Sequence, residues 1–378
     1  MRRDHSLNVP RNYKPLLVGV IWPSTALVLP WERAPRFAAI GISPEAEMDA
    51  HVGDEREIVN ELAEAIDESK RERFYELVQC GEGLAEAEAL ELAEMLLDVG
   101  TEDQAELPLS QPPSAADLVA AWREAQSEIP RESNDDSPLE DDDFGTFDGE
   151  AEAPQVAGVL SALDPRNVIR MASVLQMKDR AGVVGGRGVS KLLTDLLAIP
   201  NAEEQLRVHL VGHSYGAKVV LSALCSGDHS RKVASVLLLQ PAISRLCFAE
   251  DAGRGQAGGY RSALNRSTLP IMSTFSRKDM ALTRFFHLAA RRRSDQGELR
   301  IAAGGEPSRF AALGGFGPGN LGPEENAIVK MKSVGDNYDL NHVNEPVVSL
   351  EGHEAIHGHG DISNPYTWWV LFNAVKAS

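Results

Sequence analysis

The chain has 378 residues and carries 37 Lys and Arg against 56 Asp and Glu, which gives a formal net charge of −19. Its length can bury a substantial core and predicts either two domains or one large domain with insertions. Because a polyanion of this strength repels phosphate backbones and anionic lipid surfaces, we expect no nucleic-acid partner.

The first apolar stretch covers residues 14–22, Lys-Pro-Leu-Leu-Val-Gly-Val-Ile-Trp. A continuous apolar run of this length, ended by Pro23, predicts a fully buried parallel strand, and we assign residues 1–35 to the first strand region of the core. The apolar run over residues 16–30 is shorter than the ~20 residues that a membrane helix needs, so no membrane span is expected. Three scattered cysteines without disulfide or zinc spacing favour a cytoplasmic protein.

Residues 36–155 are expected to form an acidic, mainly helical insertion. Within it, residues 41–155 hold 34 acidic and 6 basic side chains, a net of −28, whereas the remaining residues hold 22 and 31, a net of +9. Helices are expected over residues 54–79 and 84–99, and from Ser114 through Trp122. The tail at about residues 131–152 is highly charged and poor in core-forming side chains, which predicts disorder. The insertion is also a possible binding element for a protein partner.

Residues 156–378 alternate between helical and strand patterns, which predicts the remainder of the core. Strands are expected at residues 206–212, 233–240, 269–275 and 346–350, and helices at residues 167–176, 188–197, 216–224 and 367–376. This alternation predicts an α/β fold, a doubly wound and mostly parallel sheet with helices on both faces. The Gly- and Pro-rich residues 302–324 predict a long irregular loop.

Residues 212–216, Gly-His-Ser-Tyr-Gly, match the pattern G-x-S-x-G between a predicted strand and a predicted helix. In that context Ser214 would stand on a sharp turn, with its hydroxyl clear of the sheet. The flanking glycines would avoid clashes of a Cβ with the neighbouring strand and helix. The amide of Tyr215, at the helix N-terminus, would then point at a developing oxyanion. A chance match is the alternative in a chain with 32 glycines, and the flanking elements favour the turn.

A serine hydroxyl becomes a good nucleophile only when a base takes its proton and a carboxylate orients that base. In a fold with this strand–turn–helix element the acid and then the histidine follow in the chain, each just past a strand end. Asp279 follows the strand at residues 269–275 and is the expected acid, with Asp251, after the previous strand, as the reserve. The expected base is His359, with His357 second and His353 third, between the last strand and the last helix. Such a triad requires no metal and no cofactor.

Residues 357–361, His-Gly-His-Gly-Asp, also match the start of the metal-binding pattern H-x-H-x-D-H. Imidazoles two residues apart on an extended segment share a face, so His357, His359 and Asp361 could bind Zn²⁺. However, Ile362 stands where the pattern has its third histidine, and no cluster of Cys or carboxylates completes a second site. We therefore rank a zinc-dependent hydrolase below a serine hydrolase.

The chain resembles the α/β-hydrolase superfamily over roughly residues 15–30 and 160–378. The motifs that are similar to those of a group of microbial serine hydrolases are residues 19–24 (Gly-Val-Ile-Trp-Pro-Ser), 179–193, 212–216 and 359–362. The resemblance implies a carboxylesterase- or lipase-like enzyme with nucleophile Ser214, acid Asp279 and base His359. It would act on a small-molecule acyl substrate, namely an ester, a thioester or an amide.

The chain departs from this family at one point. Such hydrolases usually have an earlier strand that ends in a His-Gly pair, whose loop supplies the second oxyanion amide, and no such pair precedes Tyr13. Either the strand at residues 14–22 takes over, with Trp22, Ser24 or Thr25 as the donor because Pro23 has no N–H, or the natural beginning is missing. The alternative function is a non-catalytic interaction protein on a hydrolase scaffold with an incomplete oxyanion hole.

Overall fold

The computed structural model describes residues 14–22, 59–80, 83–97, 114–128, 163–165, 169, 177–199, 206–253, 255–286, 307 and 311–378. Its centre is a five-stranded sheet in the order β1-β2-β3-β5-β4, in which all four pairings are parallel. The strands are β1 His209–His213, β2 Ser235–Leu239, β3 Ile271–Phe275, β4 Asn326–Lys330 and β5 Val347–Glu351. The expected α/β class with a parallel sheet is confirmed.

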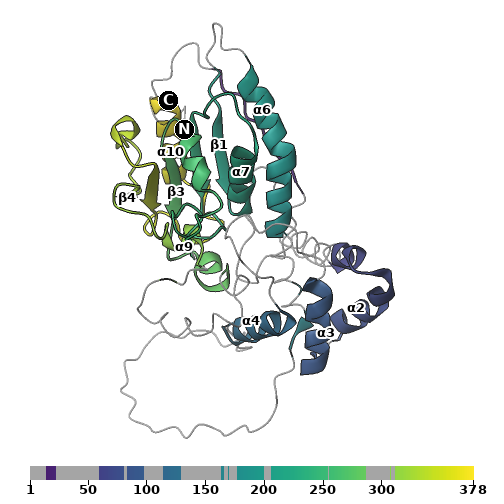
Figure 1. Cartoon of the computed structure of the whole chain (residues 1–378). Helices are drawn as coiled ribbons and strands as arrows, with labels where there is room; N and C mark the ends of the chain where they lie inside the picture. Colours follow the sequence, from purple (N-terminus) through teal and green to yellow (C-terminus); the bar gives the residue numbers. More distant parts are fainter. Residues whose placement is uncertain are drawn as a thin grey trace, which may run out of the picture.

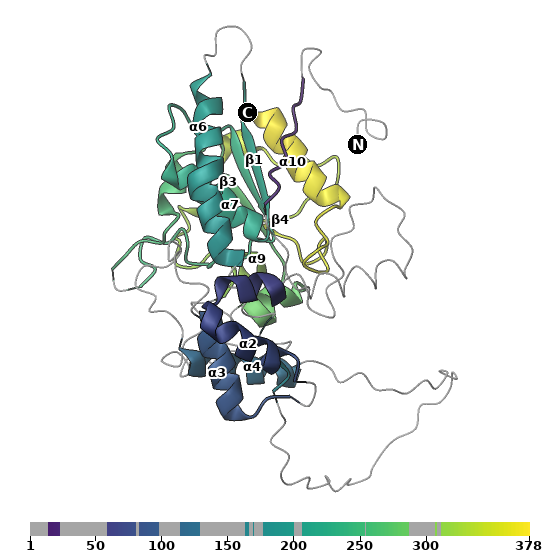
Figure 2. The ribbon, with the colours of Figure 1, turned by 90° about the vertical axis from the view of Figure 1, so that its right-hand side faces the viewer.

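Helices cover both faces of this sheet. Helices α6 (Ser190–Ala198) and α7 (Tyr215–Ser226) pack on one face, and α10 (Pro365–Ala377) packs on the other (Figures 1 and 2). Both faces need a cover because side chains alternate between the two faces of a strand, as strand β2 illustrates. Its residues Val236 and Leu238 join the core under α6 and α7, whereas Leu237 and Leu239 join the core under α10.

Most of the elements predicted for residues 156–378 are confirmed. The four expected strands correspond to β1, β2, β3 and β5, and the helices expected at residues 188–197, 216–224 and 367–376 correspond to α6, α7 and α10. The helix expected at residues 167–176 lies almost entirely outside the described residues. Strand β4 was not expected, and the region of the expected loop contains the short helix α9, Leu313–Phe316. Further short elements are η2 Val184–Val189, η3 Arg261–Asn265, η4 Ala281–Phe285 and η6 Leu340–His342.

The prediction of a buried first strand is wrong. Residues 14–22 form no strand, and Leu16, Leu17 and Ile21 are 82%, 93% and 99% exposed. Only Trp22 packs against a core cluster. An apolar run indicates that a segment can be buried, but it does not specify the neighbour that must supply the hydrogen bonds. Figure 2 shows this segment in dark purple.

The described part of the acidic segment is helical, with η1 Glu68–Lys70, α2 Arg71–Val78, α3 Glu86–Leu97 and α4 Ala115–Glu128. These helices enclose their own apolar cluster, which includes the fully buried side chains of Phe74, Leu92 and Trp122. The expected start at Ser114 is confirmed, because its hydroxyl accepts the N–H of Asp117 at 3.2 Å. The expected disordered tail and the limits at residues 35 and 155 lie outside the described residues. None of the described helices is long and apolar enough to cross a bilayer.

Candidate active site

Ser214 occupies the turn between the last residue of β1 and the first residue of α7. Its backbone has φ 54° and ψ −123°. Residues other than glycine rarely adopt this conformation, which costs about 1–3 kcal/mol. A hydrogen bond to β2 holds the turn in place, because the Ser214 N–H donates to the carbonyl of Leu239 at 3.1 Å. The Ser214 carbonyl accepts the N–H groups of Ala217 at 3.1 Å and Ala242 at 3.2 Å. The strained conformation is therefore imposed by three neighbouring segments.

The two glycines of the pentapeptide differ in what they contribute. A Cβ at Gly212 would lie 2.5 Å from the carbonyl oxygen of Gly216 and 2.7 Å from Cα of Ala217, so no side chain fits there. A Cβ at Gly216 would meet nothing within 4 Å. The expectation that both glycines relieve clashes is therefore right for Gly212 and wrong for Gly216.

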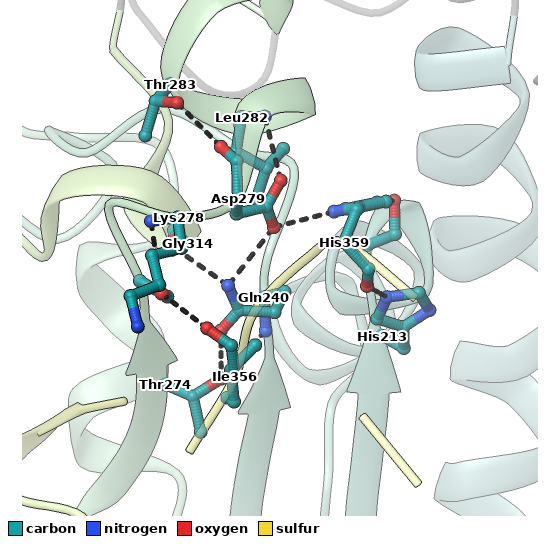
Figure 3. Close-up of polar contacts among 12 residues, drawn as sticks. His213, Gln240, Thr274, Lys278, Asp279, Leu282, Thr283, Gly314, Ile356 and His359 are labelled. Carbon is teal, nitrogen blue, oxygen red and sulfur yellow. Dashed lines mark hydrogen bonds and ion pairs between the residues drawn. The ribbon is translucent and has the colours of Figure 1, made fainter. Parts of the chain in front are cut away.

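The structure brings Ser214, His359 and Asp279 together in one chain of hydrogen bonds. The Ser214 Oγ lies 2.8 Å from Nε2 of His359, and Nδ1 of His359 lies 2.9 Å from Oδ2 of Asp279. The three residues follow the carboxyl ends of β1, β3 and β5, which meet at one edge of a parallel sheet. Figure 3 shows the side chains of Asp279 and His359 pointing at one another.

The hydrogen bonds of Asp279 determine which ring nitrogen of His359 carries the proton. Its side chain is fully buried, with Oδ1 accepting the Leu282 N–H at 3.1 Å and Oδ2 accepting from Nε2 of Gln240 at 3.1 Å. An ionised carboxylate only accepts, so we assign the proton of His359 to Nδ1, facing Asp279. Nε2 of His359 is then the acceptor for the Ser214 hydroxyl. This arrangement can take a proton from the serine and stabilise the resulting imidazolium.

His213 supports His359 from the other side. Its Nε2 donates to the carbonyl oxygen of His359 at 3.0 Å, and the two ring centroids are 5.0 Å apart (Figure 3). Burial, and then the neighbouring imidazole of His359, lower the pKa of His213 to about 4. His213 is therefore neutral at neutral pH. Sequence reasoning gave it no role, because this position of the pentapeptide can be any residue.

The two backbone positions expected to donate to an oxyanion lie near one apolar cluster. Tyr215 is the first residue of α7, and its side chain is buried with Leu282 and Phe286. Trp22 is partly buried and packs against the same cluster. The structure thus brings residue 22 to the region of Tyr215, although the strand predicted to carry it does not form.

The other histidines of this loop point elsewhere. The Nδ1 of His357 lies 3.2 Å from Nζ of Lys278 at an exposed position, and the ring of His353 packs edge-on against Phe275. The N–H of His357 donates to Asp361 at 3.0 Å. Across the described ranges no three His, Cys, Asp or Glu side chains are grouped as a metal site would require.

Comparisons with known proteins give no match. No protein-family model matches the chain, and no curated protein or solved structure is significantly similar to it. The geometry around Ser214 and general chemistry are therefore the basis for assigning a function.

Proposed function

We propose that this protein is a serine hydrolase of the α/β-hydrolase type, which cleaves an ester, a thioester or an amide through an acyl-enzyme. The observation that carries the proposal is the continuous chain of hydrogen bonds from Ser214 through His359 to Asp279, at 2.8 Å and 2.9 Å. A strained turn between a parallel strand and a helix, and the chain order serine, acid, histidine, favour this hydrolase type over others.

In the proposed reaction Ser214 attacks the acyl carbonyl while its proton passes to Nε2 of His359. Asp279 stays ionised and stabilises the imidazolium through Nδ1. His359 then protonates the leaving group, and the acyl group remains on Ser214. In the second half, His359 takes a proton from water, and the resulting attack releases the acid and restores the serine.

The tetrahedral intermediates carry negative charge on the former carbonyl oxygen, which backbone N–H groups must stabilise. We assign this task to the amides of Tyr215 and Trp22. The amide after the nucleophile is the usual first donor in this type of site. Losing one such donor costs about 10²–10³ in rate, so the placement of residue 22 matters for activity.

The proposal is tested with a fluorophosphonate probe on the intact folded protein. We expect one covalent adduct, located at Ser214, and no adduct in Ser214→Ala. The matched control is Ser262→Ala, which removes an exposed serine hydroxyl that contacts Cys225 and leaves Ser214 in place. That control should react at the wild-type rate. A folded wild-type protein that forms no adduct would refute the proposal and favour an interaction protein on a hydrolase scaffold.

A further inference from the structure

Gln240 is a buried polar residue for which the proposed mechanism has so far no use. It follows the last residue of β2, its side chain is 0% exposed, and its backbone has φ 42°, in the left-handed region. A long amide is rarely buried unless its polar atoms are bonded, and a positive φ is unusual outside glycine. Both features indicate that the surrounding structure holds this side chain in one place.

The hydrogen bonds of Gln240 fix the orientation of its amide. Nε2 lies 3.1 Å from Oδ2 of Asp279 and 3.3 Å from the carbonyl oxygen of Gly314, and both of these atoms only accept. Oε1 accepts the hydroxyl of Thr274 at 2.8 Å, and the same hydroxyl accepts the Gln240 N–H at 2.9 Å. A flipped amide would place oxygen against two acceptors, so only one orientation satisfies every partner (Figure 3).

The contact with Asp279 is made at the oxygen that matters for catalysis. Oδ2 accepts both the Gln240 amide and Nδ1 of His359, while Oδ1 accepts the Leu282 N–H. The χ2 torsion of an aspartate has a broad energy minimum, so its plane must be set by its partners. Gln240 and Leu282 hold the two oxygens from different segments and thereby aim Oδ2 at His359.

We infer that Gln240 is a positioning residue, which holds the carboxylate of Asp279 in line with His359 and is itself held by Thr274. This inference rests on the proposed hydrolase function. An amide does not titrate, so it offers Asp279 the same donor at every pH, whereas a carboxyl at this position would donate only when protonated.

The test compares Gln240→Met with Gln240→Glu by the rate of fluorophosphonate labelling at Ser214 between pH 6 and pH 9. Methionine has a similar length and no donor, so we expect labelling to fall about ten- to a hundredfold, the range for one lost bond to a charged group. Asp279 is fully buried, and two buried carboxyl groups about 3 Å apart cannot both ionise, so the introduced carboxyl can keep a proton and donate it to Asp279. Gln240→Glu should therefore label at least tenfold faster than Gln240→Met at pH 6.

Two results would overturn the inference: Gln240→Met reacting at the wild-type rate, or Gln240→Glu reacting no faster than Gln240→Met at pH 6. A general loss of packing would affect both variants equally and would not depend on a protonated carboxyl. The wild-type protein separates the two proposals. If it is labelled and the variants fail these criteria, only the positioning role is wrong; if it is not labelled, the hydrolase proposal fails and the inference with it.

Thr274 provides a second pair of variants that does not alter Gln240. Thr274→Val keeps the shape of a fully buried β3 side chain and removes the hydroxyl that contacts Gln240 twice. We expect slower labelling, and a partial return toward the wild-type rate in Thr274→Ser, which keeps the hydroxyl. Thermal unfolding of each variant shows that it is folded. Equal labelling rates for the folded valine and serine variants would contradict the role of Thr274.

Discussion

The two glycines of the pentapeptide allow the geometry of the Ser214 turn to be tested without any assumption about function. The perturbation is Gly212→Ala, compared with Gly216→Ala. At Gly212 the added methyl would lie 2.5 Å from the Gly216 oxygen, where ordinary contacts begin at 3.4 Å, and 2.7 Å from two backbone atoms of Ala217. All three obstacles are backbone, so relief requires α7 to move away from β1.

Overpacking of this kind typically costs 1–3 kcal/mol, and we expect about 3 kcal/mol because no flexible side chain can yield. For a chain of 378 residues, that loss would lower the melting temperature by roughly 4 °C. Gly216→Ala meets nothing within 4 Å and lies in the first turn of α7, so it should gain about 0.4–1 kcal/mol from the lower entropy of the unfolded chain.

The assay is thermal and denaturant unfolding of both variants beside the wild type at the same pH. The two substitutions add the same methyl group four residues apart, so solvation and composition effects cancel. If Gly216→Ala proved as destabilising as Gly212→Ala, the close approach of β1 and α7 would be refuted.

Three further predictions concern stability. His213, with its pKa lowered from 6.5 to about 4 by burial and by His359, binds its proton more weakly in the folded state, so stability is fully present above pH 6.5 and falls as the pH drops toward 4. In denaturant unfolding, we expect the free energy of unfolding to be about 2–3 kcal/mol lower at pH 4 than at pH 7. This difference should be smaller in His213→Gln. The same pH dependence in that variant as in the wild type would contradict the assignment. Asn364→Ala removes the bond from the Thr367 N–H, 3.1 Å long, that caps α10, and should cost about 1 kcal/mol in the same assay. The ion pair of Arg180 and Glu61, 2.9 Å long and partly exposed, should contribute less than about 1 kcal/mol in a double-mutant cycle.

The sequence predicts the nucleophile turn well because its causes are local. A strand, a glycine that no side chain can replace, and a helix are all encoded within residues 206–226. Asp279 and His359 were predicted from chain order and strand ends, and the structure places both in the hydrogen-bond chain from Ser214. Their catalytic roles remain predictions.

The sequence does not predict a residue's role where that role depends on partners that lie far away along the chain. Gln240 contacts Thr274 and Asp279, which lie 34 and 39 residues further along the chain, so no local pattern marks it except a polar residue after an apolar strand. Strand β4 is a half-exposed edge strand, and its pattern is too mixed to read without its partner β5. For residues 14–22 the apolar run predicted burial, although no partner strand is specified in it.

The order of the sheet has a consequence for folding. Strand β5 is the last strand in the chain, yet it pairs with both β3 and β4 and so completes the interior of the sheet. Until it inserts, β3 and β4 each present an open edge, which favours pairing with other chains. The segment that follows β5 carries His359, which must reach back 145 residues to Ser214. We therefore expect recovery of probe reactivity during refolding to coincide with the loss of aggregation-prone intermediates, since one late event closes the sheet and delivers the base.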